Sequence, residues 1–366
     1  MIKVIELFSG IGSQTQALKN IGVEHEIIAT CEWSINSIIS YGEIHNSDGK
    51  EYNKSVKEIL EELKDLTFSL DTKTPRDLTK IKEHKLKLLY KNHINSKNLG
   101  SILDVKGENL IHCDLMTYSF PCQDLSLQGK QDGLYNGKSS SLLWQVERIL
   151  DEVDKLPNML LMENVFAILN KRHKPGLDKW KKFLSDKGYH NYIFKLKSSY
   201  YGVPQNRDRC FMISSLTDLG DIESKIKINE KITNLRIKDI LEGTPIYVDH
   251  LLKHVPNIYE FTTSINYLDT IMISDNYSKF ICDRKLYSLD SIAPTLTAVG
   301  GNSTIKVWEN ERIRVLNSLE CWKLMGFKKE QWDKVVNIHS RTELVKQAGN
   351  SIVVPVLEEI FKNLFL

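Results

Sequence analysis

Strands that alternate with amphipathic helices over about the first 215 residues constrain the fold of this chain most. A short apolar run at residues 3–8, KVIELF, stops at the glycine loop SGIGS, and a helical pattern follows from Thr15 to Ile21. Further apolar runs with strand character lie at residues 25–33, 109–120, 158–165, 192–199 and 210–215. This alternation predicts a Rossmann-like, doubly wound α/β domain with a mostly parallel sheet.

The pattern changes after Leu216, so three regions are expected. Residues 1–216 form the doubly wound domain, and residues 42–99 within it are a helical insertion, because lysines, glutamates and leucines recur there at helical spacing. Residues 217–340 form a smaller, irregular domain with only short β-like pieces. Residues 341–366 carry a helical apolar stripe despite Pro355, and we expect this C-terminal segment to return to the first domain.

Composition is that of an ordinary globular chain. The 366 residues are 41% hydrophobic and 26% charged, and no apolar run approaches the roughly 20 residues that span a bilayer. The N-terminus has no signal-peptide pattern, so we expect a cytoplasmic protein without a membrane partner. The six cysteines form no CxxC pair, which argues against zinc or thioredoxin-type chemistry and predicts no metal site.

The formal net charge of +2 does not by itself indicate a nucleic-acid partner, but the charge is uneven. Residues 73–97 contain eight Lys or Arg against two acids, and residues 171–197 contain nine against two. Each segment is either a solvated helical face or a surface close to a phosphate backbone. Charge alone does not decide between these two interpretations.

The first loop has the features of a cofactor site. Gly10 and Gly12 let the backbone approach a ligand closely, but Thr15 stands where a dinucleotide fingerprint has its third glycine. Glu32 ends the second strand, where a carboxylate can bind ribose hydroxyls, and Trp33 offers a flat face to a base or a cation. Together they suit an adenosine with a sulfonium and no phosphates; the alternative is a tight turn with an ordinary glutamate.

Three further motifs carry reactive groups. Cys122 follows Pro121 on a loop after a predicted strand, which makes it a candidate nucleophile, although most lone cysteines only fill space. Glu163 closes a buried apolar strand and needs a partner or a function there. Arg207 and Arg209 are two residues apart on an extended segment, so they are expected to point the same way, toward a phosphate or a base carbonyl. A helix cap or a surface ion-pair cluster remains the alternative for these charged residues.

A thiolate, a carboxylic acid and an arginine beside an adenosyl site suit methylation of a pyrimidine carbon. C5 of cytosine is a poor nucleophile, and attack of Cys122 on C6 would turn C5 into an enamine carbon. Glu163 would hold N3 and stabilise the charge that develops there, while Arg209 would hold O2. The base that removes the C5 proton is not identifiable from the sequence.

The strings FSGIG, SFPCQDLS, MENV, QNRDR, LNSLECWKLMGF and QAGNS, in this order, resemble the motifs of the C5-cytosine-specific DNA methyltransferase family. The resemblance covers nearly the whole chain. It implies a domain that binds S-adenosyl-L-methionine and a smaller target-recognition domain that faces it across a cleft for double-stranded DNA. It also implies a target cytosine flipped out of the duplex, at a cost of about a few kcal/mol.

The resemblance assigns roles to individual residues. It implies a catalytic pocket of Cys122, Glu163, Arg207 and Arg209, a phosphate contact by Thr295, and a loop with Gln128 that closes over DNA. The base readers would lie within residues 217–310, including Ser303. Ser101 stands where the family often has an aspartate that reaches the adenine amino group, and a serine can still accept that hydrogen bond. The implied cofactor pocket is lined by Phe8, Gly10, Gly12, Glu32, Trp33, Ser101, Ile102, Pro121, Leu142, Asn350 and Ser351.

The wording TYSFPCQDLS, LLMENV and PTLTAVGGNS, together with the long insertion, is most similar to the bacterial SssI-type CpG methyltransferases, so CpG is the expected target. The family implies a monomer that acts as an orphan enzyme or beside a separate restriction endonuclease. A tRNA cytosine-5 methyltransferase and a catalytically silent DNA-binding regulator remain rival functions. A methyltransferase for a small molecule or a protein would not need Cys122 and Glu163 together.

Overall fold

The computed structural model describes residues 1–121, 142–227, 231–256, 261–262, 268–274, 276–278, 281–298 and 305–366. The chain divides into two compact units. The first unit contains residues 1–196, 208–228 and 357–366, and the second contains residues 197–207 and 229–356. No helix in these described ranges combines the length and the hydrophobicity needed to cross a bilayer.

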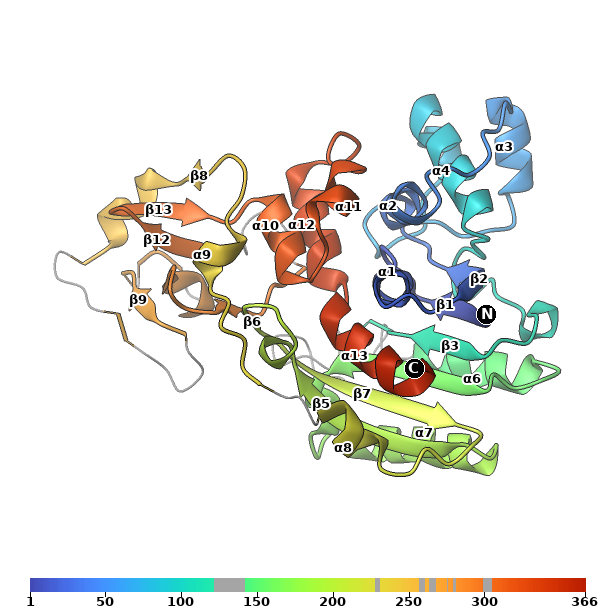
Figure 1. Ribbon diagram of the computed structural model, residues 1–366. Helices are drawn as coiled ribbons and strands as arrows, with labels where there is room; N and C mark the ends of the chain where they lie inside the picture. Colours follow the sequence, from blue (N-terminus) through green and yellow to red (C-terminus); the bar gives the residue numbers. More distant parts are fainter. Residues whose placement is uncertain are drawn as a thin grey trace. The chain divides into compact units, whose positions relative to one another are not determined.

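A six-stranded sheet forms the centre of the first unit (Figure 1). Its order is β2-β1-β3-β4-β7-β5, and the pairs β1–β2, β1–β3 and β3–β4 are parallel, while β7 runs antiparallel to β4. The predicted α/β domain with a mostly parallel sheet is therefore confirmed. The strands are β1 (Ile2–Leu7), β2 (His25–Cys31), β3 (Leu115–Tyr118), β4 (Met159–Val165), β5 (His190–Lys197) and β7 (Asp208–Ser215).

Helices cover this sheet on both sides (Figure 1). On one side α6 and α7 bury their apolar stripes, and Trp180 of α7 donates its indole N–H to the hydroxyl of Tyr118 on β3 (3.0 Å). On the other side α1 and α13 are joined by a hydrogen bond from Asn20 to Glu358 (2.6 Å). The helices here are α1 (Ser13–Asn20), α2 (Ile35–His45), α6 (Leu143–Glu152), α7 (Lys174–Asp186), α8 (Ile222–Lys227) and α13 (Val354–Phe365).

The insertion has a core of its own. Helices α3 (Val56–Glu62) and α4 (Glu83–Asn95) pack with α2 around Phe68, Leu86 and Leu89, all fully buried. Ser55 caps α3 through a capping box with Glu58, so this helix begins where its local sequence specifies. Helices α3 and α4 both lie within residues 42–99.

The second unit contains two small sheets. The five-stranded sheet has the order β8-β13-β12-β10-β9, and β6 pairs with β11 in a separate parallel pair. Its strands are β6 (Gln205–Asn206), β8 (Ile246–Tyr247), β9 (Thr270–Met272), β10 (Lys285–Ser288), β11 (Ala293–Pro294), β12 (Lys306–Glu309) and β13 (Arg312–Val315). Its helices are α9 (Ile237–Ile240), α10 (Ser318–Leu324), α11 (Lys329–Asp333) and α12 (Arg341–Asn350).

The boundaries of the second unit differ from the expected 217–340. Residues 197–207 belong to it because β6 pairs with β11 there, and α12 belongs to it because it packs against α10. The expected boundary was drawn from the change in composition after Leu216. Composition gives no information on these two long-range contacts. Residues 357–366, within α13, belong to the first unit, whereas residues 341–356 of the expected C-terminal segment fall in the second.

A buried ion pair organises the second unit. Arg314 on β13 pairs with Glu320 on α10, and their side chains are 3% and 0% exposed. Glu320 also accepts hydrogen bonds from the backbone N–H groups of Asn317 (2.8 Å) and Glu242 (3.0 Å). Burial raises the pKa of Glu320, although these partners oppose the shift. A carboxylate in this position needs its arginine, because a buried charge without a partner is costly.

Replacing Arg314 with methionine is expected to lower the free energy of unfolding by about 3–5 kcal/mol, because it leaves Glu320 buried without its cation. Urea unfolding of the purified variant measures this loss. Arg312→Met is the matched control: it removes an arginine two residues away whose pair with Asp249 is exposed, and we expect a cost of about 0–1 kcal/mol. Equal losses in the two variants would contradict the structural role of the buried pair.

Candidate active site

The carboxyl edge of the parallel strands gathers most of the predicted site in the first unit. Strand β1 pairs with β2 on one side and with β3 on the other, so the direction of winding reverses at β1. Ligands in open α/β sheets bind at such a switch point, beyond the carboxyl ends of the strands. The glycine loop follows β1, Glu32 follows β2, and the SFPC segment follows β3.

The glycine loop adopts backbone conformations that explain its glycines. Gly10 and Gly12 have φ values of 55° and 79°, in the left-handed region that favours glycine. A Cβ atom at Gly12 would lie 2.3 Å from His45 Nε2, whereas a Cβ atom at Gly10 would meet no atom within 4 Å. Gly12 is thus required by its neighbours, and Gly10 faces open space where a ligand can approach the backbone.

Glu32 is fixed beside this loop. Its carboxylate accepts hydrogen bonds from the backbone N–H groups of Gly10 (3.0 Å), Trp33 (2.9 Å) and Ser34 (2.8 Å). Glu32 and Trp33 both remain partly exposed. The structure therefore brings together the glycine loop and the carboxylate that the sequence singles out.

Two further predicted cofactor residues of this unit, Ser101 and Ile102, are less accessible than Glu32 and Trp33. Ser101 and Ile102 are 5% and 4% exposed, and the Ser101 hydroxyl accepts a weak hydrogen bond from the N–H of Leu103 (3.3 Å). Pro121 and Leu142 are partly exposed, and Leu142 caps the start of α6. Ser101 already has this partner within its own turn, so an adenine amino group would have to share its oxygen.

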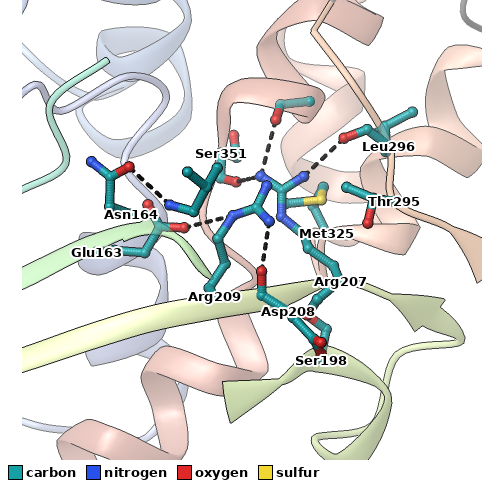
Figure 2. A network of polar contacts seen from close by, with 12 residues as sticks. Glu163, Asn164, Ser198, Arg207, Asp208, Arg209, Thr295, Leu296, Met325 and Ser351 are labelled. Atoms are coloured by element: carbon teal, nitrogen blue, oxygen red, sulfur yellow. Dashed lines mark hydrogen bonds and ion pairs between the residues drawn. The ribbon is translucent and has the colours of Figure 1, made fainter. Parts of the chain in front are cut away.

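The carboxylic acid and one arginine of the predicted catalytic pocket meet directly (Figure 2). Glu163 Oε1 lies 3.0 Å from Arg209 Nε, and the two side chains are 11% and 16% exposed. The antiparallel register of β4 and β7, with Val165 opposite Arg209, brings the two residues together. An ion pair this well shielded from water is strong and directional.

Asn164 holds the segment that leads to Cys122. Its side-chain amide donates to the carbonyl oxygen of Phe120 (3.1 Å), and its Oδ1 accepts the N–H of Val165 (2.9 Å). Cys122 itself lies outside the described residues, as do Gln128 and Ser303. Asn164 is part of the quoted MENV string, but no sequence signal indicated this contact, because it joins residues 44 positions apart.

Four other cysteines are poor candidates for a nucleophile. Cys31, Cys113, Cys210 and Cys321 are free thiols that are 0–1% exposed. Burial raises the pKa of Cys113, Cys210 and Cys321 to about 12 and also raises that of Cys31. Because the thiolate is the nucleophile, these buried thiols are inert near neutral pH.

Arg207 has a different set of partners from Arg209, all within the second unit (Figure 2). Its guanidinium donates to the carbonyl oxygens of Leu296 (2.8 Å), Gly349 (3.1 Å) and Ser351 (3.0 Å), and the residue is 3% exposed. The spacing of the two arginines suggested that they share one target. In the structure they have different partners instead. The placement of Arg207 in the catalytic pocket stays a prediction, and its described contacts are structural.

The segments with Thr295 and with Asn350 and Ser351 are also packed together in the second unit. Thr295 Oγ1 donates to the carbonyl oxygen of Asn206 (2.6 Å). A Cβ atom at Gly349 would lie 2.5 Å from the carbonyl oxygen of Thr297, so only glycine fits there. Asn350 is exposed at the end of α12, while Ser351 is 8% exposed.

Ion pairs neutralise much of the two basic segments. Lys91 pairs with Glu51 in the first segment, and Lys187 pairs with Asp151 in the second. These pairs favour the interpretation of both segments as solvated helical faces over that of phosphate-binding surfaces. Lys171 and Lys174 are exposed and form no ion pair within the described part of the chain, so a phosphate contact stays open for them. The other pairs are Lys80–Asp77, Lys87–Glu83, Lys97–Glu26, Lys182–Asp186 and Lys195–Asp208.

A buried carboxyl group lies under the glycine loop. Glu6, near the end of β1, is 0% exposed and accepts a hydrogen bond from Thr15 Oγ1 (2.8 Å), which lies 2.8 Å from the hydroxyl of Tyr41. Burial raises the pKa of Glu6 to about 7, although the hydrogen bonds with Thr15 and Tyr41 oppose the shift. Thr15, which replaces the third glycine of a dinucleotide loop, thus holds this carboxyl in place.

Comparisons with known proteins agree with the motifs. Residues 78–366 match the family model of the C-5 cytosine-specific DNA methylases. The orphan methyltransferase M.SssI of Spiroplasma monobiae is 37% identical over 99% of this chain and 97% of its own. The type II methyltransferase M2.ScrFI of Lactococcus lactis subsp. cremoris is 34% identical over 100% and 99%. The structure of the S. pombe Dnmt2 methyltransferase shares the fold, with a TM-score of 0.63 at 18% identity and coverage of 100% and 98%.

The raised pKa of Glu6 predicts a pH-dependent stability. Between the ordinary value of 4.5 and about 7, the folded protein holds a proton that the unfolded chain has released. The resulting stability is fully present below pH 4.5 and is lost as the pH rises through 7. Glu6→Gln should therefore reduce the fall in unfolding free energy between pH 5 and 7 by up to about 1 kcal/mol per pH unit.

Urea unfolding at several pH values measures this slope. Glu24→Gln, which changes an exposed carboxylate, is the control and should leave the slope as it is in the natural chain. Parallel curves for Glu6→Gln and the natural chain would show that Glu6 does not bind the proton.

Proposed function

The chain belongs to the C-5 cytosine-specific DNA methylase family and is a DNA (cytosine-5)-methyltransferase, and from this premise we propose how its residues carry out the reaction. We propose that Glu163 and Arg209 hold a flipped-out cytosine while Cys122 attacks it. The observation that carries this proposal is the shielded pair of Glu163 and Arg209 at the ligand edge of the sheet. The pair presents a carboxyl group and a guanidinium to the same small volume, as N3 and O2 of one cytosine require.

The residues beside the glycine loop of the first unit are proposed to bind S-adenosylmethionine. Open space at Gly10 leaves room for the ligand, the carboxylate of Glu32 can accept hydrogen bonds from ribose hydroxyls, and Trp33 offers a flat face to the adenine or the sulfonium. When bound, S-adenosylmethionine supplies the methyl group. Asn350 and Ser351 are proposed to complete the pocket, on the basis of the motif resemblance.

The protein residues then act on the base in sequence. The Cys122 thiolate forms a bond to C6, while Glu163 donates a proton to N3 and Arg209 hydrogen-bonds O2, so that C5 becomes an enamine carbon. After C5 has taken the methyl group it loses its proton to a base, the Cys122–C6 bond breaks by β-elimination, and N3 returns its proton to Glu163, which restores the aromatic ring of the neutral base. Cys122 is proposed as the nucleophile on the motif resemblance, and burial disfavours Cys31, Cys113, Cys210 and Cys321 for this role.

Within the second unit, Arg207 is proposed to hold the segment around Leu296 and residues 349–351 in place, and its role in the catalytic pocket stays a prediction. Its hydrogen bonds join the carbonyl oxygens of Leu296, Gly349 and Ser351. Thr295, beside Leu296, is proposed to contact a phosphate, and Gln128 and Ser303 are proposed to contact DNA. CpG remains the proposed target sequence, on the motif resemblance.

The proposed context is a monomeric enzyme that acts on duplex DNA inside the cell. The two similar proteins are named an orphan methyltransferase and a type II methyltransferase, so both settings are open for this chain, with or without a partner endonuclease. The rival substrate is tRNA. Duplex DNA and tRNA, tested side by side for uptake of labelled methyl groups, distinguish the two, and methylation of tRNA alone would overturn the proposal.

The role of Cys122 predicts covalent trapping. A duplex with 5-fluorocytosine at the target should form a complex with the natural chain that survives a denaturing gel, because fluorine cannot leave C5 as a proton does. Bisulfite sequencing of unmethylated DNA treated with the enzyme identifies the target sequence to be used. Cys122→Ser should give neither methylation nor the trapped band. A natural chain that methylates DNA but gives no shifted band would exclude the covalent route.

The role of Arg209 predicts a loss of rate. Arg209→Ala should lower kcat by about 10²–10³-fold, because a donor to the developing charge is removed, while the affinity for S-adenosylmethionine stays the same. Lys195→Ala is the control, since it removes an exposed cation on the neighbouring strand that pairs with Asp208. Single-turnover methylation separates the chemical step from binding. A kcat equal to that of the control would show that Arg209 does not act on the base.

A further inference from the structure

The helical insertion contacts the residue proposed to bind the ribose. The side-chain amide of Asn98, which follows α4, forms two hydrogen bonds with the backbone of Glu32. Asn98 Oδ1 accepts the N–H of Glu32 (2.9 Å), and Asn98 Nδ2 donates to the carbonyl oxygen of Glu32 (3.0 Å). Asn98 is 6% exposed, so this pair of bonds is shielded from water and directional.

The insertion also pairs with the chain on both sides of Glu32. Before it, the N–H of Thr30 donates to the carbonyl oxygen of Lys97 (3.2 Å), and the N–H of Leu99 donates to that of Thr30 (2.9 Å). After it, the N–H of Ser69 donates to the carbonyl oxygen of Trp33 (2.7 Å). Residues 30–33 are thus held along one edge by two separate segments of the insertion.

A buried histidine orients Asn98. His93 on α4 is 5% exposed, and its Nδ1 lies 3.1 Å from Asn98 Nδ2. Burial lowers the pKa of His93 to about 4, so the ring is neutral near neutral pH. Its Nδ1 can therefore accept a hydrogen bond from the side-chain amide of Asn98. The ring packs edge-on against Phe68 (5.5 Å between centroids), which belongs to the core of the insertion. The packing of that core therefore fixes His93, and His93 fixes Asn98.

We propose that Asn98 is a positioning residue for Glu32, and that the insertion serves to hold this carboxylate where it can bind the ribose of S-adenosylmethionine. This inference rests on the proposed role of Glu32. The backbone donors of Trp33 and Ser34 orient the carboxylate relative to its own turn, and that of Gly10 orients it relative to the glycine loop. Asn98 connects that turn to a separate, packed body, and small displacements of a binding group cost affinity steeply.

The test is the dissociation constant of S-adenosylmethionine, measured by isothermal titration calorimetry. Asn98→Ala should raise this constant about tenfold, the effect of losing a buried hydrogen-bonding partner. The kcat at saturating S-adenosylmethionine and the affinity for duplex DNA should stay unchanged. A raised KM without a lower kcat is the signature of a group that acts only through cofactor binding.

A double-mutant cycle with Glu32→Ala separates positioning from general destabilisation. If Asn98 acts through Glu32, Asn98→Ala should weaken binding no further once the Glu32 carboxylate is gone. Additive losses in the double variant would overturn the proposal. His93→Phe gives a second route to the same test if Asn98→Ala does not fold: it keeps a ring against Phe68 but removes the acceptor. It should raise the constant severalfold, again only when Glu32 is present.

Asn92→Ala is the matched control, on helix α4, which precedes Asn98. Asn92 is 0% exposed and bonds Glu43 (3.0 Å) and the carbonyl oxygen of Leu88 (3.0 Å), so its loss disturbs the insertion without contacting Glu32. Thermal unfolding should show a loss of stability for both asparagine variants, whereas only Asn98→Ala should weaken cofactor binding. An equal weakening by Asn92→Ala would overturn the proposal. A natural chain that binds no S-adenosylmethionine would instead refute the proposed function.

Discussion

The antiparallel pairing of β7 with β4 is the constraint on which the catalytic arrangement depends. It aligns Arg209 with Val165 and so brings the guanidinium to the Glu163 carboxylate. A parallel β7 would place its carboxyl end at that edge, and the QNRDR segment that precedes it would lie at the opposite edge. One reversed strand in a mostly parallel sheet therefore makes it possible to combine a carboxyl group that ends one strand with an arginine that begins another.

The same strand also marks the change from one unit to the other. Arg209, on β7, has its partner in the first unit, and Arg207, just before β7, has its partners in the second. Both side chains are mostly buried, and a buried guanidinium needs oxygen acceptors for its charge and its N–H groups. For Arg209 the acceptors include a carboxylate, which a substrate can share. For Arg207 they are carbonyl oxygens, which suits a structural role.

The sequence predicted those features of the fold and the site that depend on local spacing. The glycine loop, the acid that follows β2 and the strand that carries Glu163 follow from apolar periodicity and from residues within one turn of each other. The partners of Arg207 lie 89 to 144 positions away, and Asn98 lies 66 positions from Glu32, so no local pattern indicates them. The boundaries of the second unit were missed for the same reason.

The insertion also solves a general problem of this sheet. Strand β2 lies at its edge, and an edge strand exposes unpaired N–H and C=O groups. In this chain Lys97, Leu99 and Ser69 of the insertion form backbone hydrogen bonds with Thr30 and Trp33. The side chain of Asn98 forms hydrogen bonds with the backbone of Glu32. An edge that carries a binding carboxylate has to be both protected and rigid, because displacement of the carboxylate weakens its hydrogen bonds to a ligand. Covering the edge with a separately packed helical body meets both requirements. Protecting and stiffening this edge is therefore a physical role for the insertion, residues 42–99.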